Sequence, residues 1–233
     1  EGQKINIGLS MQDPSETIMV SEEVLVKSRL DDFGLTKSDI AKICQAALNG
    51  KSLSSALQPK TAEGLLKYIF GVEGLREFCL SLQKVKYKPF SKTNLEGVLD
   101  AVNGRKIMFQ MVDLACAATA PQPKSKIGEA KRQFIEQSKQ PSLFPEWDKE
   151  DRVVLEYKNA LESAECWYVI VSIDEDNVVC CELSRPKSVV DDKFLGFHER
   201  VQVFKYGEFA LDDIEDAEDT EDAFEIKPSI TKK

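Results

Sequence analysis

Three side chains in this chain have the types needed to hold a metal ion and activate water. Glu156 and Lys158 stand two residues apart in the stretch RVVLEYK at 152–158, and Asp113 lies inside the apolar run 106–118. If 152–158 is a β-strand, alternation places Glu156 and Lys158 on one face. Carboxylates are ligands that Mg²⁺ prefers, and a lysine beside them can position the attacking water. The alternative interpretation is an exposed ion pair between Glu156 and Lys158.

Glu-x-Lys at a strand end, with an aspartate on a neighbouring strand, resembles the metal site of PD-(D/E)xK nucleases. In that family the carboxylates hold magnesium and the lysine helps to activate water, so the resemblance implies a catalytic set of Asp113, Glu156 and Lys158. An aspartate in so apolar a run needs a partner, because an unpaired buried charge is costly. Asp113 precedes Glu156 by more than 40 residues, a longer spacing than the family uses. A nuclease that requires Mg²⁺ is therefore one alternative function.

Other catalytic and metal-binding signatures are missing from the sequence. His198 is the single histidine and no nucleophile motif accompanies it, so we expect it in a loop or at a strand edge. No Cys-x-x-Cys pair is present, and the glycines form neither a P-loop nor a G-x-G-x-x-G fingerprint. Outside the nuclease alternative we predict no catalytic residue, no metal and no cofactor. Glu182 and Arg185 are a further charged pair, and we expect Glu182 to bind an arginine or a backbone amide for structural reasons.

Opposite charges are sorted into different parts of the chain. Residues 84–140 contain eleven Lys and Arg against five Asp and Glu, whereas residues 212–233 contain nine acidic residues and three lysines. A basic segment attracts DNA or RNA, and an acidic tail can compete for the same groove, with Phe224 as an apolar anchor. The alternative is a solvated, disordered tail. The predicted nucleic-acid-binding residues lie on and beside one face of a helix expected at 126–137: Lys124, Lys126, Lys131, Arg132 and Lys139.

The stretch QPSLFPEWDKE carries apolar residues in an otherwise polar loop. Leu143, Phe144 and Trp147 either latch this loop onto the folded body or bind a partner protein. These patterns indicate contacts rather than chemistry. Our leading hypothesis is therefore a non-enzymatic binding or regulatory protein that acts near nucleic acid. The alternatives are the nuclease and a protein-interaction module that uses the 141–147 loop or the acidic tail.

Residues 21–82 have the pattern of a small helical unit. Thr36, with Asp39 three residues later, has the form of a capping box, and Gly50 is expected to end that helix. A further helix is expected to begin after Thr61. Its expected inward stripe consists of Leu65, Leu66, Ile69, Val72, Leu75, Phe78, Cys79 and Leu82. The unit is either a helix-turn-helix that contacts DNA or a helical layer on a sheet, and we favour the layer.

The remaining chain alternates between strand and helix patterns. The hydrophobic runs around Trp167 and Val179 indicate the centre of a sheet, with 174–177 as the hairpin loop between them. We expect an exposed or edge strand at 85–88 with its lysines outward, and strands at 105–120, 152–158, 167–173, 178–183 and 200–205. The end of the 105–120 strand, at 115–120, is alternatively a close-packed helical turn. Helices are expected at 93–104 and 126–137. The sequence therefore predicts an α+β protein. Its predicted parts are an N-terminal helical region at 1–83 packed beside a mixed β-sheet domain at 84–206, and a disordered acidic C-terminal tail at 207–233.

Cysteine usage and hydropathy indicate a compartment. Four of the six cysteines stand inside apolar patterns, so we expect reduced, buried thiols. No apolar run approaches the roughly 18–20 residues needed to span a bilayer, and no secretory signal is visible. We therefore expect a cytoplasmic protein.

Four stretches between about Pro59 and Phe204 are similar, in type and order, to a group of uncharacterised bacterial proteins found in phage-like and mobile elements. The stretches are SALQPKTAEGLLKYIFGVEGLRE, RKIMFQMVDLACAATA, PKSKIGEAKRQFIEQSKQPSLFP and WYVIVSIDEDNVVCCELSRP. The Glu-Leu-Ser-x-Pro motif at 182–186, after the Trp-Tyr strand, carries most of the similarity. The resemblance implies a bacterial cytoplasmic setting and a link to phage or mobile DNA, and it implies no catalytic residue.

Overall fold

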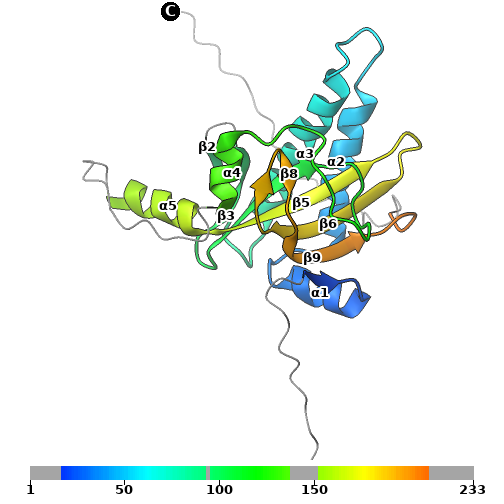
Figure 1. Cartoon of the computed structure of the whole chain (residues 1–233). Helices are drawn as coiled ribbons and strands as arrows, with labels where there is room; N and C mark the ends of the chain where they lie inside the picture. Colours follow the sequence, from blue (N-terminus) through cyan, green and yellow to red (C-terminus); the bar gives the residue numbers. More distant parts are fainter. Residues whose placement is uncertain (1–16, 93–94, 137–151, 210–233) are drawn as a thin grey trace, which may run out of the picture.

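A computed structural model describes residues 17–92, 95–136 and 152–209 of the 233-residue chain. Helices and a large mixed β-sheet confirm the predicted α+β class (Figure 1). The helices are α1 (Glu23–Asp31), α2 (Lys37–Ser52), α3 (Ala62–Ser81), α4 (Glu129–Glu136) and α5 (Arg152–Ser163). The strands are β1 (Ile18–Val20), β2 (Lys88–Lys92), β3 (Leu95–Asp100), β4 (Arg105–Met111), β5 (Glu165–Ile173), β6 (Val179–Pro186), β7 (Val189–Val190), β8 (Lys193–Phe194) and β9 (Phe197–Phe204).

Within the described residues, seven strands form the main sheet in the order β1-β9-β6-β5-β4-β3-β2. β1 pairs with β9 and β4 pairs with β5 in parallel, and the other neighbours are antiparallel. β7 and β8 form a separate hairpin. The parallel step from β4 to β5 requires a crossover, and this part of the chain carries α4 and α5. None of the helices in the described ranges is both long and apolar enough to cross a membrane.

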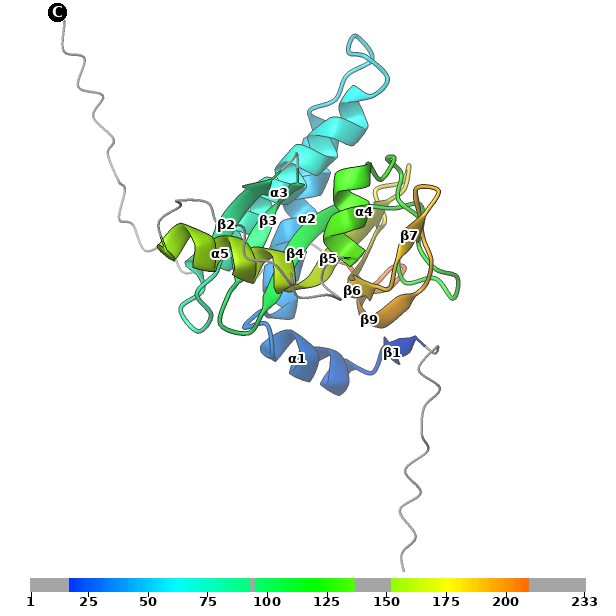
Figure 2. The ribbon, with the colours of Figure 1, turned by 60° about the vertical axis from the view of Figure 1, so that its left-hand side comes forward.

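The two faces of the sheet are covered by different parts of the chain. α1, α2 and α3 pack on one face, whereas the 112–128 loop, α4, α5 and the β7–β8 hairpin cover the other (Figures 1 and 2). Hydrophobic side chains such as Trp167 and Phe109 point to the α1–α3 side, which we call the apolar face. Alternation turns the intervening residues to the other side. We call that side the polar face because it buries Lys106, Gln110, Ser172, Glu182, Ser184 and Arg200.

The predicted capping box at the start of α2 is confirmed. Thr36 Oγ1 accepts a hydrogen bond from the Asp39 backbone N–H at 3.1 Å, and the Asp39 carboxylate accepts one from the Thr36 backbone N–H at 2.8 Å. The predicted helix end at Gly50 is wrong, because α2 continues to Ser52. A Cβ at Gly50 would lie 2.6 Å from the Leu66 carbonyl oxygen, so this glycine permits α2 and α3 to pack closely.

α3 packs on β3 and β4, which confirms the expected helical layer on the sheet. A Cβ at Gly71 would lie 2.3 Å from the ring of Phe109, so the helix backbone rests almost directly on the sheet there. The predicted inward stripe of this helix is only partly confirmed. Leu65 and Ile69 are 58% and 47% exposed and lie outside the core.

The helix predicted at 93–104 is wrong, because β3 occupies its centre. Leu99 packs on the polar face and Val98 on the apolar face, so a strand buried on both sides imitates helical spacing. Gly97 belongs to the sheet as well. A Cβ there would lie 2.3 Å from the Ile107 carbonyl oxygen on the paired strand β4.

The strand predicted at 152–158 is also wrong, because this stretch is the first half of α5. Tyr157, Ala160, Leu161 and Ala164 recur at i, i+3, i+4 and i+7 and pack into the cluster on the polar face. The helical period becomes visible only beyond the apolar run VVL, which by itself resembles a strand.

The other predicted elements are present with shifted ends. β4 ends at Met111, so the strand predicted at 105–120 is shorter than expected. The edge strand predicted at 85–88 begins only at its last residue, although both of its lysines are exposed as expected. The hairpin loop at 174–177, the α4 helix and the last strand are confirmed. The predicted acidic tail lies outside the described residues beyond Phe209.

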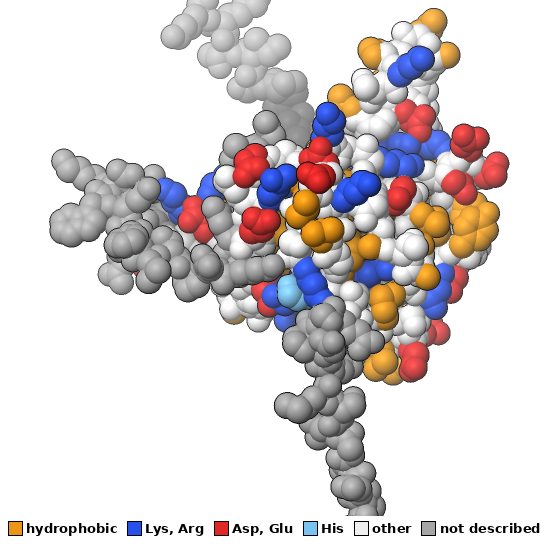
Figure 3. Space-filling model, viewed as in Figure 1, with side chains coloured by type: hydrophobic (Ala, Val, Ile, Leu, Met, Phe, Trp, Pro, Cys, Tyr) orange, Lys and Arg blue, Asp and Glu red, His pale blue; other side chains and the backbone are white. Residues whose placement is uncertain are grey.

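The far ends of α2 and α3 extend beyond the sheet as a projecting hairpin (Figures 1 and 2). Lys51, near the end of α2, donates to the Asp174 carbonyl oxygen at 2.5 Å and to Asn177 Oδ1 at 2.8 Å. These hydrogen bonds tie the hairpin to the β5–β6 loop. Hydrophobic side chains are exposed at its projecting end (Figure 3).

Candidate functional site on the polar face

Charged and polar side chains are buried together on the polar face. Lys106, Gln110, Glu182, Ser184 and Arg200 are each at most 3% exposed. Burying a charge is costly unless it is paired and hydrogen-bonded. Buried ionisable groups with a specific partner are therefore either structural anchors or functional candidates, and their contacts decide between the two.

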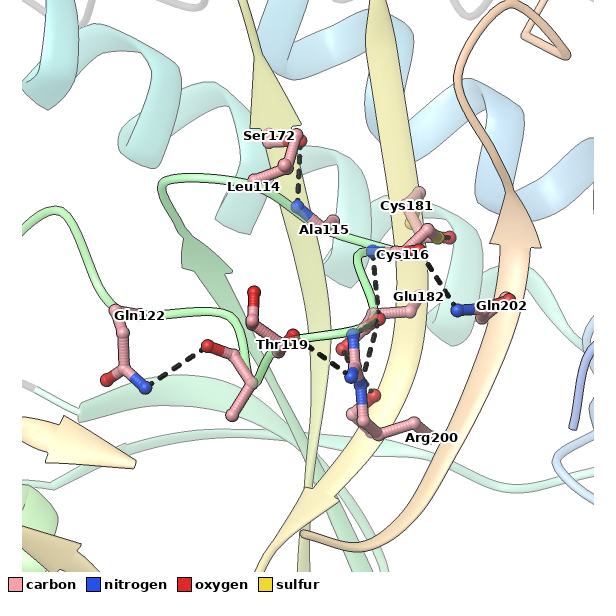
Figure 4. Close-up of polar contacts among 12 residues, drawn as sticks. Leu114, Ala115, Cys116, Thr119, Gln122, Ser172, Cys181, Glu182, Arg200 and Gln202 are labelled. Carbon is pink, nitrogen blue, oxygen red and sulfur yellow. Dashed lines mark hydrogen bonds and ion pairs between the residues drawn. The ribbon is translucent and has the colours of Figure 1, made fainter. Parts of the chain in front are cut away.

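Glu182 and Arg200 form a buried ion pair at the centre of this face (Figure 4). Arg200 Nη2 lies 2.7 Å from Glu182 Oε2, and Arg200 Nε lies 3.1 Å from Glu182 Oε1. The hydroxyl of Ser184 donates to Glu182 Oε1 at 3.0 Å, and the Cys116 backbone N–H donates to Oε2 at 3.0 Å. The carboxylate is thus surrounded by donors from the protein itself.

The same cluster fixes the loop that follows β4. Arg200 Nη1 donates to the Thr119 carbonyl oxygen at 3.2 Å, and Gln202 Nε2 donates to the Cys116 carbonyl oxygen at 3.1 Å. The Ala115 backbone N–H donates to the Ser172 hydroxyl at 3.0 Å (Figure 4). A loop buried against a sheet must satisfy its backbone groups, and here the side chains of β5, β6 and β9 do so.

Cys116 is held inside this loop with a φ of 59°, a left-handed conformation that costs a non-glycine residue energy. Its thiol donates to the carbonyl oxygens of Cys181 at 3.2 Å and Phe204 at 3.3 Å. Burial, and to a smaller extent the charge of Glu182, raises the pKa of the thiol well above its usual value. A neutral thiol is a weak nucleophile, so the contacts indicate a structural role for Cys116.

We expected Glu182 to bind an arginine or a backbone amide, and it binds both, but the arginine is Arg200 and not Arg185. Arg185 instead pairs with Glu165, with 2.8 Å between Nη1 and Oε1. Residues three apart on a strand point to opposite faces, so Arg185 cannot reach the buried carboxylate. The spacing of the two residues in the sequence does not identify Arg200 as the partner of Glu182.

Two lysines enter the polar face from its other end. Lys131 of α4 donates to Gln110 Oε1, and its Nζ lies 5.1 Å from the centre of the Tyr168 ring. Lys106 is fully buried and donates to the Leu161 carbonyl oxygen at 3.1 Å. Burial lowers the pKa of each lysine to about 8, because removal from water disfavours the ammonium form.

A lysine with a lowered pKa can act as a base or form a Schiff base when a substrate reaches it. The structure has a cavity of about 680 Å³ between α1, the start of α2 and β9, and one of about 760 Å³ beside α3 and β3. Neither cavity is lined by Lys106 or Lys131. Both lysines contact protein groups that hold α4 and α5 to the sheet, so the polar face acts as an anchor.

The residues predicted for metal-dependent catalysis are not brought together. Asp113 is exposed in the turn after β4, where it accepts hydrogen bonds from the Leu114 and Gln122 backbone N–H groups, each at 2.7 Å. Glu156 and Lys158 belong to a helix, in which residues two apart point in directions roughly 160° apart around the axis. They therefore do not share a face, as the predicted strand required.

Asp113 and α5 also lie at opposite ends of β4. Leu161 of α5 contacts Lys106, near the start of that strand. Asp113 follows Lys106 by seven residues, which corresponds to roughly 23 Å of extended chain. No group of three or more potential metal ligands occurs among the described residues.

The lysines predicted to bind nucleic acid do not form one open face. Lys124 and Lys126 are exposed before α4. The pKa of Glu63 in α3 is lowered mainly by its hydrogen bond with Lys67, and the charge of Lys124 helps to lower it. Lys131 instead turns toward the sheet, and Arg132 lies 3.5 Å from Glu129. Lys139 lies outside the described residues. Basic and acidic side chains are interspersed on the face shown in Figure 3.

Other predicted contact residues fall in different places. Leu143, Phe144 and Trp147 lie outside the described residues, as does the acidic stretch of the tail. His198 is the second residue of β9 and is half-buried.

Sequence reasoning missed an exposed apolar group on the projecting hairpin. We call it the apolar crest and define it as Leu53, Leu57, Leu65 and Ile69, which are 56%, 98%, 58% and 47% exposed. Ile69 is the member nearest the sheet and lines the cavity beside α3 and β3. Leu65 and Ile69 are four residues apart and share a face of α3. Both belong to the apolar stripe that the sequence predicts to face inward, so the pattern did not mark them as exposed.

No family model, no curated protein and no solved structure matches this chain.

Proposed function

We propose that this chain is a non-enzymatic binding protein whose main contact is another protein, made through the apolar crest. The exposure of the four crest side chains, up to 98% for Leu57, is the observation that carries the proposal. A single exposed leucine is ordinary on a protein surface. Several exposed apolar side chains on one projecting element are a mark of an interaction site.

The support beneath the crest favours a preformed contact surface. The close packing of α2 on α3 at Gly50 and the hydrogen bonds from Lys51 to the β5–β6 loop hold the hairpin in place. A surface that is ordered before binding loses less conformational entropy when the partner arrives. Ser54, Ser55 and Lys60 are polar residues of the same connection between α2 and α3 that carries Leu53 and Leu57, and polar residues beside apolar ones are usual in an interface. The expected partner is a protein that presents an apolar groove.

The test compares one crest variant with a matched control. The double substitution Leu57→Glu and Leu65→Glu places charges in the contact, whereas Val102→Glu places one at an exposed turn of the sheet, where Val102 is 85% exposed. A partner is identified by cross-linking in cells and its affinity is then measured by calorimetry with purified proteins. We expect binding to weaken at least tenfold for the crest variant, about 1.4 kcal/mol, and to stay unchanged for the control. Equal affinities would reject the crest.

Contact with nucleic acid is the second candidate. It is supported by the exposure of Lys124 and Lys126, which lie two residues apart before α4. The acidic tail would act as the competitor, so residues 210–233 are removed before the assay. We expect retarded migration of DNA or RNA at low salt, weakened by Lys124→Glu with Lys126→Glu and not by Lys84→Glu with Lys86→Glu. No retardation by the truncated protein would end this candidate.

A reducing compartment fits both candidates. All six cysteines are unpaired thiols, and five of them are buried. Proteins of oxidising compartments commonly pair their cysteines. A cytoplasmic location, as the resemblance to phage-like and mobile-element proteins implies, is part of the proposal.

A further inference from the structure

A cavity of about 680 Å³ lies between α1, the start of α2 and the end of β9. One face of α1 forms a wall along its whole length, because the lining residues of this helix recur at intervals of three and four: Glu23, Val26, Lys27, Leu30 and Asp31. The start of α2 and the end of β9 supply the other walls. Cavities of roughly 300–1,000 Å³ are typical of small-molecule sites, so the volume suits one small organic molecule.

Polar contacts hold α1 in place over this cavity. Arg29 Nε and Nη2 donate to the two carboxylate oxygens of Glu199 in β9, at 2.6 Å and 2.9 Å. The Arg29 guanidinium also lies 5.2 Å from the centre of the Trp167 ring. Directly after β9, Lys205 Nζ donates to the carbonyl oxygen of Ser21 at 3.2 Å, just before α1 begins. The walls are therefore fixed by contacts within the chain, and a preformed site loses less conformational entropy when it binds.

The inner wall of the cavity is apolar. Val26, Leu30, Leu35 and Val203 line the cavity, and each is at most 5% exposed. They belong to α1, to the turn before α2 and to β9, so apolar surface converges from three parts of the fold. An apolar body that packs against this surface leaves water, which is favourable. The lining therefore favours a ligand that is largely apolar.

Charges of both signs surround the apolar wall in equal number. The described lining residues include three lysines and three carboxylates, namely Lys27, Lys37, Lys205, Glu23, Asp31 and Glu208. The Glu208 carboxylate already accepts the Lys205 backbone N–H at 2.9 Å, and Lys37 Nζ lies 5.1 Å from the centre of the Phe204 ring. Because neither sign is in excess, the lining attracts neither anions nor cations, and a charged ligand would lose water without a matching counter-charge. An uncharged ligand fits this balance.

One polar group at the cavity is left without a partner. The hydroxyl oxygen of Ser38 is buried and has no hydrogen-bond partner in the described parts of the chain. Ser38 is also one of the residues of α2 that line the cavity. Burying a hydroxyl without a partner is unfavourable, so a ligand group that hydrogen-bonds to it gains affinity.

We propose that this cavity binds an uncharged, largely apolar small molecule that carries one polar group for the Ser38 hydroxyl. The apolar body of the ligand packs against Leu30, Leu35 and Val203, and the charged side chains at the rim stay in water. Helix α1 lies at the end of the molecule opposite the projecting hairpin (Figures 1 and 2). The site is therefore independent of the proposed contact through the apolar crest.

The test uses two fluorescent probes that share one ring system and differ in charge. N-phenyl-1-naphthylamine is uncharged and carries one N–H donor, whereas 1-anilinonaphthalene-8-sulfonate adds a sulfonate to the same rings. Titration of the full chain measures both affinities from the rise in fluorescence as the probe leaves water. We expect saturable one-to-one binding of the uncharged probe, at least tenfold tighter than binding of the sulfonate, because the balanced lining offers the sulfonate no counter-charge.

Substitutions on α1 and α2 locate the bound probe. Lys27→Trp places an indole at the cavity, whereas Ser28→Trp places the same group at the next exposed position of α1, which does not line the cavity. We expect Lys27→Trp to weaken binding of the uncharged probe at least tenfold and Ser28→Trp to leave it unchanged. Ser38→Ala should weaken it by roughly two- to tenfold, as for the loss of one hydrogen bond. The urea midpoint of each variant serves as the folding control.

Three results would overturn the proposal. The first is the absence of saturable binding of the uncharged probe to the wild type. The second is equal or tighter binding of the sulfonate, which would assign the cavity to anions. The third is weaker binding in the variant that combines Leu57→Glu and Leu65→Glu while Lys27→Trp binds normally, which would place the probe on the crest.

Discussion

The apolar face and the polar face of the sheet are built from alternate residues of the same strands, yet they hold the fold together by different means. On the apolar face, Trp167, Val169 and Phe109 pack against α1–α3 with no directional requirement. On the polar face, Glu182 and Arg200 bind backbone groups of the loop after β4. Hydrophobic burial is non-directional, whereas hydrogen bonds to specific backbone groups fix the conformation of the loop.

The loop after β4 crosses the polar face of the sheet without forming a helix or a strand. The loop after β4 has small residues and offers little apolar surface of its own. Its position therefore depends on the buried charges beneath it, and we expect it to be lost when those charges are disturbed. The packing of α1–α3 on the apolar face should be unaffected when the buried charges of the polar face are changed.

The largest effects are expected for Glu182→Ala and Leu183→Ala, which change neighbouring residues on opposite faces. Glu182→Ala leaves Arg200 buried without a counter-charge and should lower the free energy of unfolding by about 3–5 kcal/mol. Leu183→Ala should cost about 2–5 kcal/mol through the cavity it leaves. Hydrogen exchange separates the two, because only Glu182→Ala should expose the Cys116 amide. Equal exposure in both variants would contradict an anchoring role for the polar face.

The next effect concerns close packing on the apolar face and uses two glycines of α3. Gly71→Ala would bring a Cβ within 2.3 Å of the Phe109 ring, whereas Gly64→Ala meets nothing within 4 Å. We expect Gly71→Ala to destabilise by about 1–3 kcal/mol through overpacking. Gly64→Ala should stabilise by up to about 1 kcal/mol through helix propensity. Urea unfolding of both variants tests this, and a stabilising Gly71→Ala would show that α3 does not rest on the sheet as described.

A pH effect should distinguish the polar face from the apolar one. The pKa of Lys106 is lowered to about 8 by burial, so between about pH 8 and 10.5 the unfolded chain binds more protons than the folded protein. Lys106 therefore makes the unfolding free energy rise with pH in that window, by at most about 1.4 kcal/mol per pH unit. Lys106→Met should remove this positive contribution.

The exposed Lys126→Met is the matched control for Lys106 and should leave the slope unchanged. The buried thiol of Cys166, whose pKa burial raises, contributes with the opposite sign, so the slopes of wild type and variant are compared rather than read singly. An identical pH slope for wild type and Lys106→Met would mean that Lys106 is not desolvated in the folded protein.

The smallest effect is expected for Arg185→Ala. Its ion pair with Glu165 has side chains that are 29% and 40% exposed, unlike the buried pair of Glu182 and Arg200. Partly exposed pairs contribute about 0.2–1 kcal/mol. Thermal unfolding should therefore barely change. A loss as large as that of Glu182→Ala would remove the distinction between the two pairs.

Local signals predicted the elements that local chemistry determines. The capping box of Thr36 and Asp39 and the strands around the 174–177 loop are confirmed because their hydrogen bonds and turns lie within a few residues. The errors at 93–104 and 152–158 arose where burial on two sides, or a short apolar run, hid the true period.

The polar face could be predicted only in part. An isolated glutamate in an apolar run signals a buried partner, and the expected partner of Glu182, an arginine or a backbone amide, is confirmed. The identity of Arg200 depends on the pairing of β6 with β9, and the inward turn of Lys131 depends on how α4 packs. Both are tertiary facts with no local signature. The apolar crest was missed for the same reason, since periodicity cannot say where a helix extends beyond its sheet.

The polar face anchors the loop after β4, α4 and α5 to the sheet, whereas partner contact through the apolar crest is our proposal. The most direct measurement determines both the unfolding free energy and the partner affinity of the variant that combines Leu57→Glu and Leu65→Glu. We expect stability within about 0.5 kcal/mol of the wild type, as for exposed sites, together with at least tenfold weaker binding. Wild-type affinity in a variant that remains fully folded would contradict the central claim.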